Sequence, residues 1–397
     1  FVPVLFGERP AGPWLWELHN EHRFPLPRLI YLGLFRLSGD LRTGCWVSFL
    51  GISLVAAGLV RLARAVRGRA HIADAVFPLL LMHTGQAENL YMGYQMAFML
   101  TAALAAALLA VIVRTGEAGR FRRGLLATLI GWLLLTCGAA GLVYGIAAAG
   151  WVLYLAVRGR MAVRERIVLV VLAAVTPAYV AIYFQGYVRP SHHPPSAGFY
   201  ESARVGLEAQ AMALGPAATG LWPYVAIAIL LVGCLVAIQI AVRLRSDQAR
   251  AVGLLLFVGG AATVAFGIGW GRSGFLDDMG FAWRYGWVTG PAVWAAYFTW
   301  LICGGRVSVY GPLALFGVAL ILAPFNTASG FLDAEKVLRP RENAWEADAR
   351  AGMSEEQLAR THYPDYGPTG QAEIREAVRL MRAHRYTYYE SPGEEGS

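Results

Sequence analysis

The stretch MAFMLTAALAAALLAVIVRTGEAGRFRR, residues 96–123, decides the class of this protein. Residues 96–113 contain no charged side chain, and a run of about 20 apolar residues is long enough to cross the hydrocarbon core of a bilayer as a helix. The arginines that follow, Arg114, Arg120, Arg122 and Arg123, are typical of a cytoplasmic loop. We therefore expect a spanning helix whose C-terminal end faces the cytoplasm.

The composition of the whole chain agrees with a polytopic membrane protein. Of its 397 residues, 57% are hydrophobic and only 15% are charged, and the mean hydropathy is +0.47. The net charge of +8 comes from arginines in short loops between apolar runs, so we predict no nucleic-acid partner. Cys45, Cys137, Cys234 and Cys303 have no paired spacing and are interpreted as small core residues.

The apolar runs predict an all-α integral membrane protein with about ten transmembrane helices. Arginines after alternate runs place both ends of this chain outside the cytoplasm. Because the chain starts at Phe1 without a methionine, we also expect a first helix to be missing. The expected spans are near 46–63, 73–85, 93–113, 167–185, 221–242, 251–268, 287–303 and 307–325, with a hairpin of two in 124–157 that turns at Cys137 to Gly141.

Three parts are expected along the chain. Residues 1–45 form an outer-face segment, in which Pro25 opens an interfacial helix at about 25–40. Residues 46–325 form the transmembrane domain. Residues 326–397 form a small polar extracytoplasmic tail, with one helix that starts after the N-cap Ser354 and another at about 370–384.

Four polar segments fall on the expected outer side: residues 20–23, 86–95, 186–220 and 271–285. The first contains Asn20-Glu21-His22-Arg23. A carboxylate beside a cation in a partly dehydrated cleft can take a proton from a hydroxyl, so Glu21 is the candidate general base. The alternative is that Glu21, His22 and Arg23 form an ordinary solvated turn.

The last of these segments contains two arginines that are candidates for binding a phosphate. The guanidinium groups of Arg272 and Arg284 have the fork geometry that suits a phosphate. Alternatively, they pair with Asp277 and Asp278. We predict no metal site, and these two aspartates are the candidate ligands if a divalent cation is a cofactor.

Glu88, Asn89 and Gln95 lie where a span emerges from the membrane. Polar groups at that depth are costly unless they are partnered or functional, so we consider them candidates for substrate binding. The adjacent histidines at 192 and 193 are interpreted as loop residues, with a metal site as the alternative.

Several short motifs resemble those of a broad group of uncharacterised bacterial polytopic membrane proteins. They are N-E-H-R at 20–23, N-L-x-x-G-Y-Q at 89–95, G-R-S-G-F at 271–275 with R-Y at 284–285, and L-M-R-A-H-R-Y at 380–386. The architecture of that group is similar to that of the GT-C glycosyltransferases, which use a sugar carried on a polyprenyl phosphate.

This resemblance implies a multi-pass protein of the bacterial inner membrane with its C-terminus outside. It implies that Glu21, beside His22 and Arg23, acts as the catalytic base, and that Arg272 or Arg284 binds the phosphate of a lipid-linked sugar taken from the membrane. Many GT-C enzymes have an aspartate or a pair of acids in this loop, whereas here a single Glu21 is followed by His22.

Two other functions compete with a transferase. A non-catalytic membrane subunit would dock a protein partner at the outer face through the tail with Tyr386, Tyr388 and Tyr389. A secondary transporter would need ionisable residues near the middle of the membrane, and the expected spans lack central Asp, Glu or Lys. We therefore expect the transferase first and the transporter last.

Overall fold

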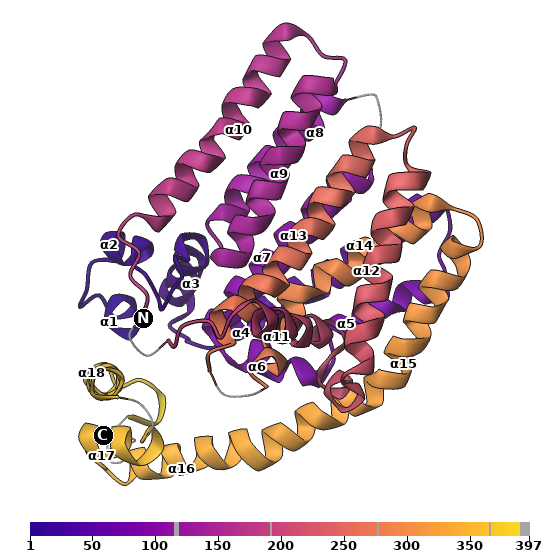
Figure 1. The fold of residues 1–397 in the computed structure, drawn as a ribbon. Helices are drawn as coiled ribbons and strands as arrows, with labels where there is room; N and C mark the ends of the chain where they lie inside the picture. Colours follow the sequence, from indigo (N-terminus) through magenta and orange to yellow (C-terminus); the bar gives the residue numbers. More distant parts are fainter. Residues whose placement is uncertain (115–118, 191–192, 276–277, 365–366, 390–397) are drawn as a thin grey trace.

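The computed structural model describes residues 1–114, 119–190, 193–275, 278–364 and 367–389. Within these residues the chain is helical, and its one β-type contact is an isolated pair between His19 and His22. Figure 1 shows a bundle of long helices, with an arm that runs from α15 along one end of the bundle to a small C-terminal unit.

Seven helices in the described part of the chain are long and apolar enough to cross a membrane. They define an all-α, multi-pass membrane protein. Five are α4 (Thr43–Arg67), α9 (Ala139–Arg158), α10 (Val163–Phe184), α12 (Tyr224–Arg243) and α13 (Gln248–Arg272). The others are Gly93–Val113, which contains α7 (Met96–Val113), and Val307–Arg350, which joins α15 (Val307–Asp333), a π-helical turn (Ala334–Leu338) and α16 (Arg339–Arg350).

The predicted count of about ten spanning helices is not confirmed. The hairpin in 124–157 is present, and it turns at Gly138, whose φ of 92° favours glycine. Its first helix, α8 (Arg120–Leu135), has 16 residues and is about 24 Å long. A further helix in the bundle, α14 (Tyr285–Cys303), packs against α7, α13 and α15.

The span predicted at 73–85 is not a continuous helix. This part of the chain is a series of short helical pieces: η1 (Ile72–Ala75), α5 (Val76–Leu81), η2 (Thr84–Gln86), α6 (Ala87–Tyr91) and η3 (Gly93–Gln95). The break follows from a close contact with α15, because a Cβ on Gly330 would lie 2.1 Å from the carbonyl oxygen of Thr84. We call residues 72–95 the broken pass.

The broken pass returns along α4 from one end to the other. It starts beside the C-terminal end of α4, where Arg67 Nη1 lies 2.8 Å from Asp74 Oδ1. It finishes beside the N-terminal end, where a Cβ on Gly44 would lie 2.4 Å from the carbonyl oxygen of Gly93. The 25 residues of α4 are about 37 Å long, so the chain covers the length of a membrane span without a continuous helix.

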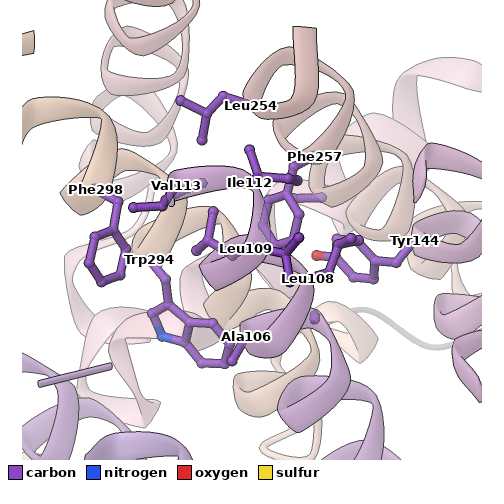
Figure 2. Close-up of a cluster of buried hydrophobic side chains, with 14 of the residues drawn as sticks. Ala106, Leu108, Leu109, Ile112, Val113, Tyr144, Leu254, Phe257, Trp294 and Phe298 are labelled. Atoms are coloured by element: carbon purple, nitrogen blue, oxygen red, sulfur yellow. The ribbon is translucent and has the colours of Figure 1, made fainter. Parts of the chain in front are cut away.

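Helix α7 lies at the centre of the bundle. In its most apolar stretch 67% of residues are buried, against 17% for α10 at the periphery. Figure 2 shows Leu109 and Ile112 of α7 among large side chains of the neighbouring helices, including Phe257 and Trp294. Because lipid tails are as apolar as this core, close packing rather than removal from water holds the helices together.

Helix α11 (Phe199–Ala211) packs on the C-terminal half of α13 at glycines. A Cβ on Gly269 would lie 1.9 Å from the carbonyl oxygen of Ser202, and a Cβ on Gly206 would lie 2.8 Å from that of Ala265. The two backbones are therefore in direct contact, which fixes the loop between α10 and α12 against α13.

The N-terminal segment contains α1 (Val2–Leu5), α2 (Ala11–Trp16) and α3 (Pro25–Ser38). The helix predicted at about 25–40 is confirmed, and it ends at Gly39 with φ 69°. Its Leu37 is 87% exposed, as expected for a side chain that faces lipid. The expected boundary between this segment and the membrane domain, at 45, falls inside α4.

The C-terminal unit contains α16, α17 (Glu355–His362), α18 (Pro368–Ala383) and η8 (Thr387–Tyr389). Both predicted tail helices are confirmed, and Ser354 caps α17 by accepting a hydrogen bond from the backbone N–H of Gln357. The expected boundary at 325 falls inside α15, which continues into the tail. The unit folds back on the N-terminal segment: His384 stacks on Phe6 at 4.4 Å, and Leu41 N–H donates to Tyr386 OH at 2.8 Å.

The contact between α11 and α13 gives a test of the fold. We expect Gly269→Ala to lower the melting temperature in detergent by several degrees, because the new methyl group would overlap backbone atoms and overpacking costs about 1–3 kcal/mol. Gly267→Ala is the matched control, since a Cβ at Gly267 meets nothing within 4 Å. Equal melting temperatures for the two variants would contradict this packing.

Candidate functional site

A tight turn presents Glu21 at one end of the bundle. His22 N–H donates to the carbonyl of His19 at 3.0 Å and His19 N–H donates back at 2.7 Å. Asn20 occupies the left-handed region with φ 51°, which asparagine tolerates better than most residues. The N-E-H-R segment is therefore part of a hydrogen-bonded turn.

Three distant segments meet at the Glu21 carboxylate. Arg272 Nη2, at the end of α13, donates to Oε1 at 2.8 Å. His193 Nδ1, from the loop after α10, lies 3.0 Å from Oε2, and His22 Nε2 lies 3.6 Å from Oε1. We call Glu21, His22, His193 and Arg272 the Glu21 cluster. Their side chains are 9% to 29% exposed, so the cluster is sheltered but reachable.

Aromatic residues hold the cluster in place. The guanidinium of Arg272 lies 5.4 Å from the ring centre of Phe275, and the His193 ring meets the same phenyl edge-on at 5.2 Å. Arg272 Nε also donates to Tyr285 OH at 3.2 Å. Arg272 is therefore oriented by an acid, a phenol and an aromatic face together.

The loop that carries His193 is fastened to the end of α13. Ser273 Oγ accepts a hydrogen bond from Ala197 N–H at 3.1 Å and lies 3.3 Å from Ser196 Oγ. A Cβ on Gly274 would lie 2.0 Å from the carbonyl oxygen of Pro195, so the two backbones touch. These contacts fix His193 relative to Arg272.

The charges in the cluster follow from its burial and its neighbours. Burial alone would raise the pKa of Glu21, but His22 and Arg272 together hold it below its usual value. Burial lowers the pKa of His22 to about 4, although Glu21 opposes this. At neutral pH His22 is therefore neutral, and Arg272 is the cation that keeps Glu21 ionised.

A second acid and arginine pair lies beside the cluster. Glu88 in α6 accepts hydrogen bonds from Arg284 Nη1 and, at 3.1 Å, from Arg284 N–H. Asn89 Nδ2 donates to the Arg284 carbonyl at 3.2 Å. Arg284 also lies 5.3 Å from the ring centre of Tyr285, which contacts Arg272. The structure thus brings together five of the predicted site residues: Glu21, Arg272, Glu88, Asn89 and Arg284.

Other predicted site residues have different surroundings. Arg23 is 7% exposed and donates to the backbone carbonyls of Trp16, Tyr183 and Gln185, so its geometry supports a structural role and not substrate binding. Gln95 is buried in η3, where the broken pass meets α4.

Of the two alternative ion pairs, the one between Arg284 and Asp278 is not formed. Arg284 pairs with Glu88, and Asp278 forms no ion pair with a described residue. Asp277 lies outside the described residues. No group of three or more His, Cys, Asp or Glu side chains in the described part of the chain is arranged to hold a metal ion.

His193 is the residue whose position the sequence analysis missed. The sequence predicts only a loop at this position, and the neighbouring His192 lies outside the described residues. The one available signal was its place in the polar segment 186–220, which was expected on the same side of the membrane as Glu21.

The fold and the site define a multi-pass membrane protein with an acid, arginine and histidine cluster at one end of its helix bundle. Comparison with models of protein families, with curated proteins and with solved structures found no match. The function must therefore be inferred from the site itself.

The buried Arg23 allows a test of its structural role. We expect Arg23→Gln to destabilise the protein by about 2–4 kcal/mol, because it leaves buried carbonyl groups without donors. Thermal unfolding in detergent measures the loss. Arg42→Gln is the control, because Arg42 is 79% exposed, and a similar drop in both variants would contradict the structural role.

The lowered pKa of His22 predicts a pH dependence of stability. The unfolded chain takes up a proton on His22 as the pH falls below about 6.5, whereas the folded protein resists until about 4. The stabilisation from neutral His22 is thus complete above pH 6.5 and is lost as the pH falls to 4, by at most about 1.4 kcal/mol per pH unit.

Melting temperatures measured from pH 7 to pH 5 check this expectation. His19 has a pKa lowered to about 4 by burial as well, so His22→Asn should reduce the slope and His19→Asn with His22→Asn should flatten it further. The same slope in the wild type and in the double variant would refute the assignment.

Proposed function

We propose that this protein is a membrane glycosyltransferase that uses a polyprenyl-phosphate-linked sugar at the outer leaflet, with the Glu21 cluster as its reaction site. One observation carries the proposal. Glu21 and Arg272, the predicted base and the predicted phosphate ligand, are 251 residues apart in the sequence and form a 2.8 Å hydrogen bond. A solvated turn would not require such a partner.

The reaction would use each member of the cluster in a separate role. Glu21 takes the proton of an acceptor hydroxyl as its oxygen attacks the anomeric carbon of the sugar. The bond between that carbon and the phosphate oxygen breaks, and the electron pair stays on the lipid phosphate. Arg272 stabilises the phosphate charge, with Arg284 close by.

The ion pair couples donor binding to the activation of the base. While Arg272 contacts Glu21, the carboxylate is held ionised and is a weak base. A donor phosphate competes for the same guanidinium. Once Arg272 turns to the phosphate, one of the charges that lower the pKa of Glu21 is withdrawn, and the carboxylate becomes a better proton acceptor.

The position of the cluster suits a substrate that arrives within the membrane. Helix α3 begins two residues after Arg23 and has Leu29 and Leu37 exposed. These side chains fit an interfacial helix beside the site. A lipid-linked donor could then reach Arg272 by lateral diffusion along the bilayer.

The alternative, a non-catalytic subunit that docks a partner through its tail, has less support. Tyr386 and Tyr389 are used inside the chain: Tyr386 OH accepts a hydrogen bond from Leu41 N–H, and Tyr389 OH accepts one from Trp345 Nε1 at 2.8 Å. Deleting residues 340–397 would break a co-purifying complex if this alternative held.

Mass spectrometry of the lipids retained by the purified protein tests the transferase. We expect a polyprenyl phosphate in the wild type and in Glu21→Gln, because Glu21 is not its ligand, and its loss from Arg272→Ala. Glu21→Gln should also reduce sugar transfer at least about 100-fold, as for loss of a general base.

Arg42→Ala provides the matched control. Arg42 also forms an ion pair with a carboxylate, since its Nη2 lies 2.8 Å from Asp40 Oδ2, but the Arg42 side chain is exposed. This variant should keep the lipid. Ordinary phospholipids in every sample, or loss of the polyprenyl phosphate from Arg42→Ala as well, would refute the proposal.

A further inference from the structure

A pocket of about 360 Å³ lies near the Glu21 cluster and is separate from it. Its wall is formed by α6 of the broken pass, by residues 278–283, and by the junction of α15 with α16. This volume falls within the range of pockets that hold small molecules. None of the residues of the Glu21 cluster lines it.

Three carboxylates line the pocket, and two of them have no cationic partner. Glu88 is neutralised by its ion pair with Arg284. Asp278 and Asp333 form no ion pair with any residue in the described part of the chain. Lys336, one turn after Asp333, also forms none there. The pocket therefore has an excess of negative charge.

The rest of the lining is apolar and aromatic. Tyr91 is 57% exposed and Met92 is 41% exposed, and Trp283 and Phe281 also line the pocket. Aromatic faces attract cations, and apolar side chains favour an organic ligand over a hydrated metal ion. Aromatic faces beside unpaired carboxylates complement an organic cation.

The wall also includes a break in helix geometry. Asp333 immediately precedes the π-helical turn Ala334–Leu338, and Leu338, the last residue of that turn, lines the pocket as well. Such turns are frequent at functional sites because they redirect side chains. Here the turn lies where α15 passes into the arm.

We propose that this pocket binds a protonated primary amine attached to an organic body. The ammonium group donates hydrogen bonds to Asp278 and Asp333, and the body lies against Tyr91 and Trp283. Asp278 is exposed and Asp333 is half-buried, so an amine can reach both carboxylates, and unlike a neutral ligand it offsets their charge with charge-assisted hydrogen bonds. The inference does not depend on the transferase, because it uses no residue of the Glu21 cluster.

The amine could belong to a soluble compound or to a lipid headgroup, and two matched pairs of probes distinguish these sources. Glucosamine is compared with glucose, by the rise in melting temperature of the full chain in maltoside micelles. Phosphatidylethanolamine is compared with phosphatidylglycerol of the same acyl chains, by native mass spectrometry. In at least one pair we expect the probe with an amine to bind, and the matched probe without an amine to bind at least about tenfold more weakly.

Single variants locate the binding. Asp278→Asn and Asp333→Asn should each weaken binding of the amine about tenfold, as expected for loss of one charge-assisted hydrogen bond. Asp40→Asn is the control and should bind as the wild type does, because Asp40 is neutralised by Arg42 and lies outside the pocket. If Asp278→Asn does not fold, Asp333→Asn carries the test.

The outcomes separate clearly. Binding of glucosamine alone assigns a soluble amine, and binding of phosphatidylethanolamine alone assigns a lipid headgroup. The proposal is overturned if neither amine binds better than its partner without an amine. It is also overturned if binding in Asp333→Asn is unchanged from the wild type.

Discussion

The need to satisfy every backbone hydrogen bond inside the bilayer governs this fold. Continuous helices meet it on their own, which explains why most passes are uninterrupted. The broken pass meets it through its neighbours. Trp287 Nε1 of α14 donates to the carbonyl of Leu81 at 3.2 Å, and the Thr84 hydroxyl in turn donates to the Thr327 carbonyl of α15 at 2.7 Å. Irregular backbone is tolerated here because α14 supplies a partner and α15 packs against it.

The arginines at the site end of the bundle fall into two chemical groups. Arg23 and Arg28 donate to backbone carbonyls, and each lies over an aromatic ring, so they fasten the N-terminal segment. Arg272 and Arg284 instead face carboxylates and flank Tyr285. A guanidinium paired with a carboxylate can exchange that partner for a phosphate. If a guanidinium bound to backbone carbonyls turned to a phosphate, it would leave those buried carbonyl groups without a donor. This difference separates arginines that hold the fold from those that can bind an anionic ligand.

The C-terminal unit and the arm that leads to it connect the surroundings of the Glu21 cluster with those of the pocket. The C-terminal unit packs on the N-terminal segment through Phe6 and His384, and the N-terminal segment carries Glu21. The arm that leads to this unit begins at Asp333 and the π-helical turn, which line the pocket that also contains Asp278. The continuation of α15 beyond the bundle therefore links the tail to both sites.

Sequence alone determined what depends on local composition. Apolar runs of sufficient length predicted most of the spanning helices, prolines and Gly39 bounded α3, and Ser354 marked the start of α17. It also placed Glu21, Glu88 and Arg272 in polar segments expected on one side of the membrane. These features follow from hydropathy, capping and charge, which act over a few residues.

Only the tertiary structure decided what depends on contacts between distant segments. The run at 73–85 is apolar enough to suggest a helix, yet Gly330 packs against Thr84 and the helix ends early. Arg23 is two residues after Glu21 in the sequence, but its side chain donates to carbonyls at the C-terminal end of α10, and His193 lies beside the acid. No local pattern determines these partners, because side-chain pairing is set by the packing of the whole bundle.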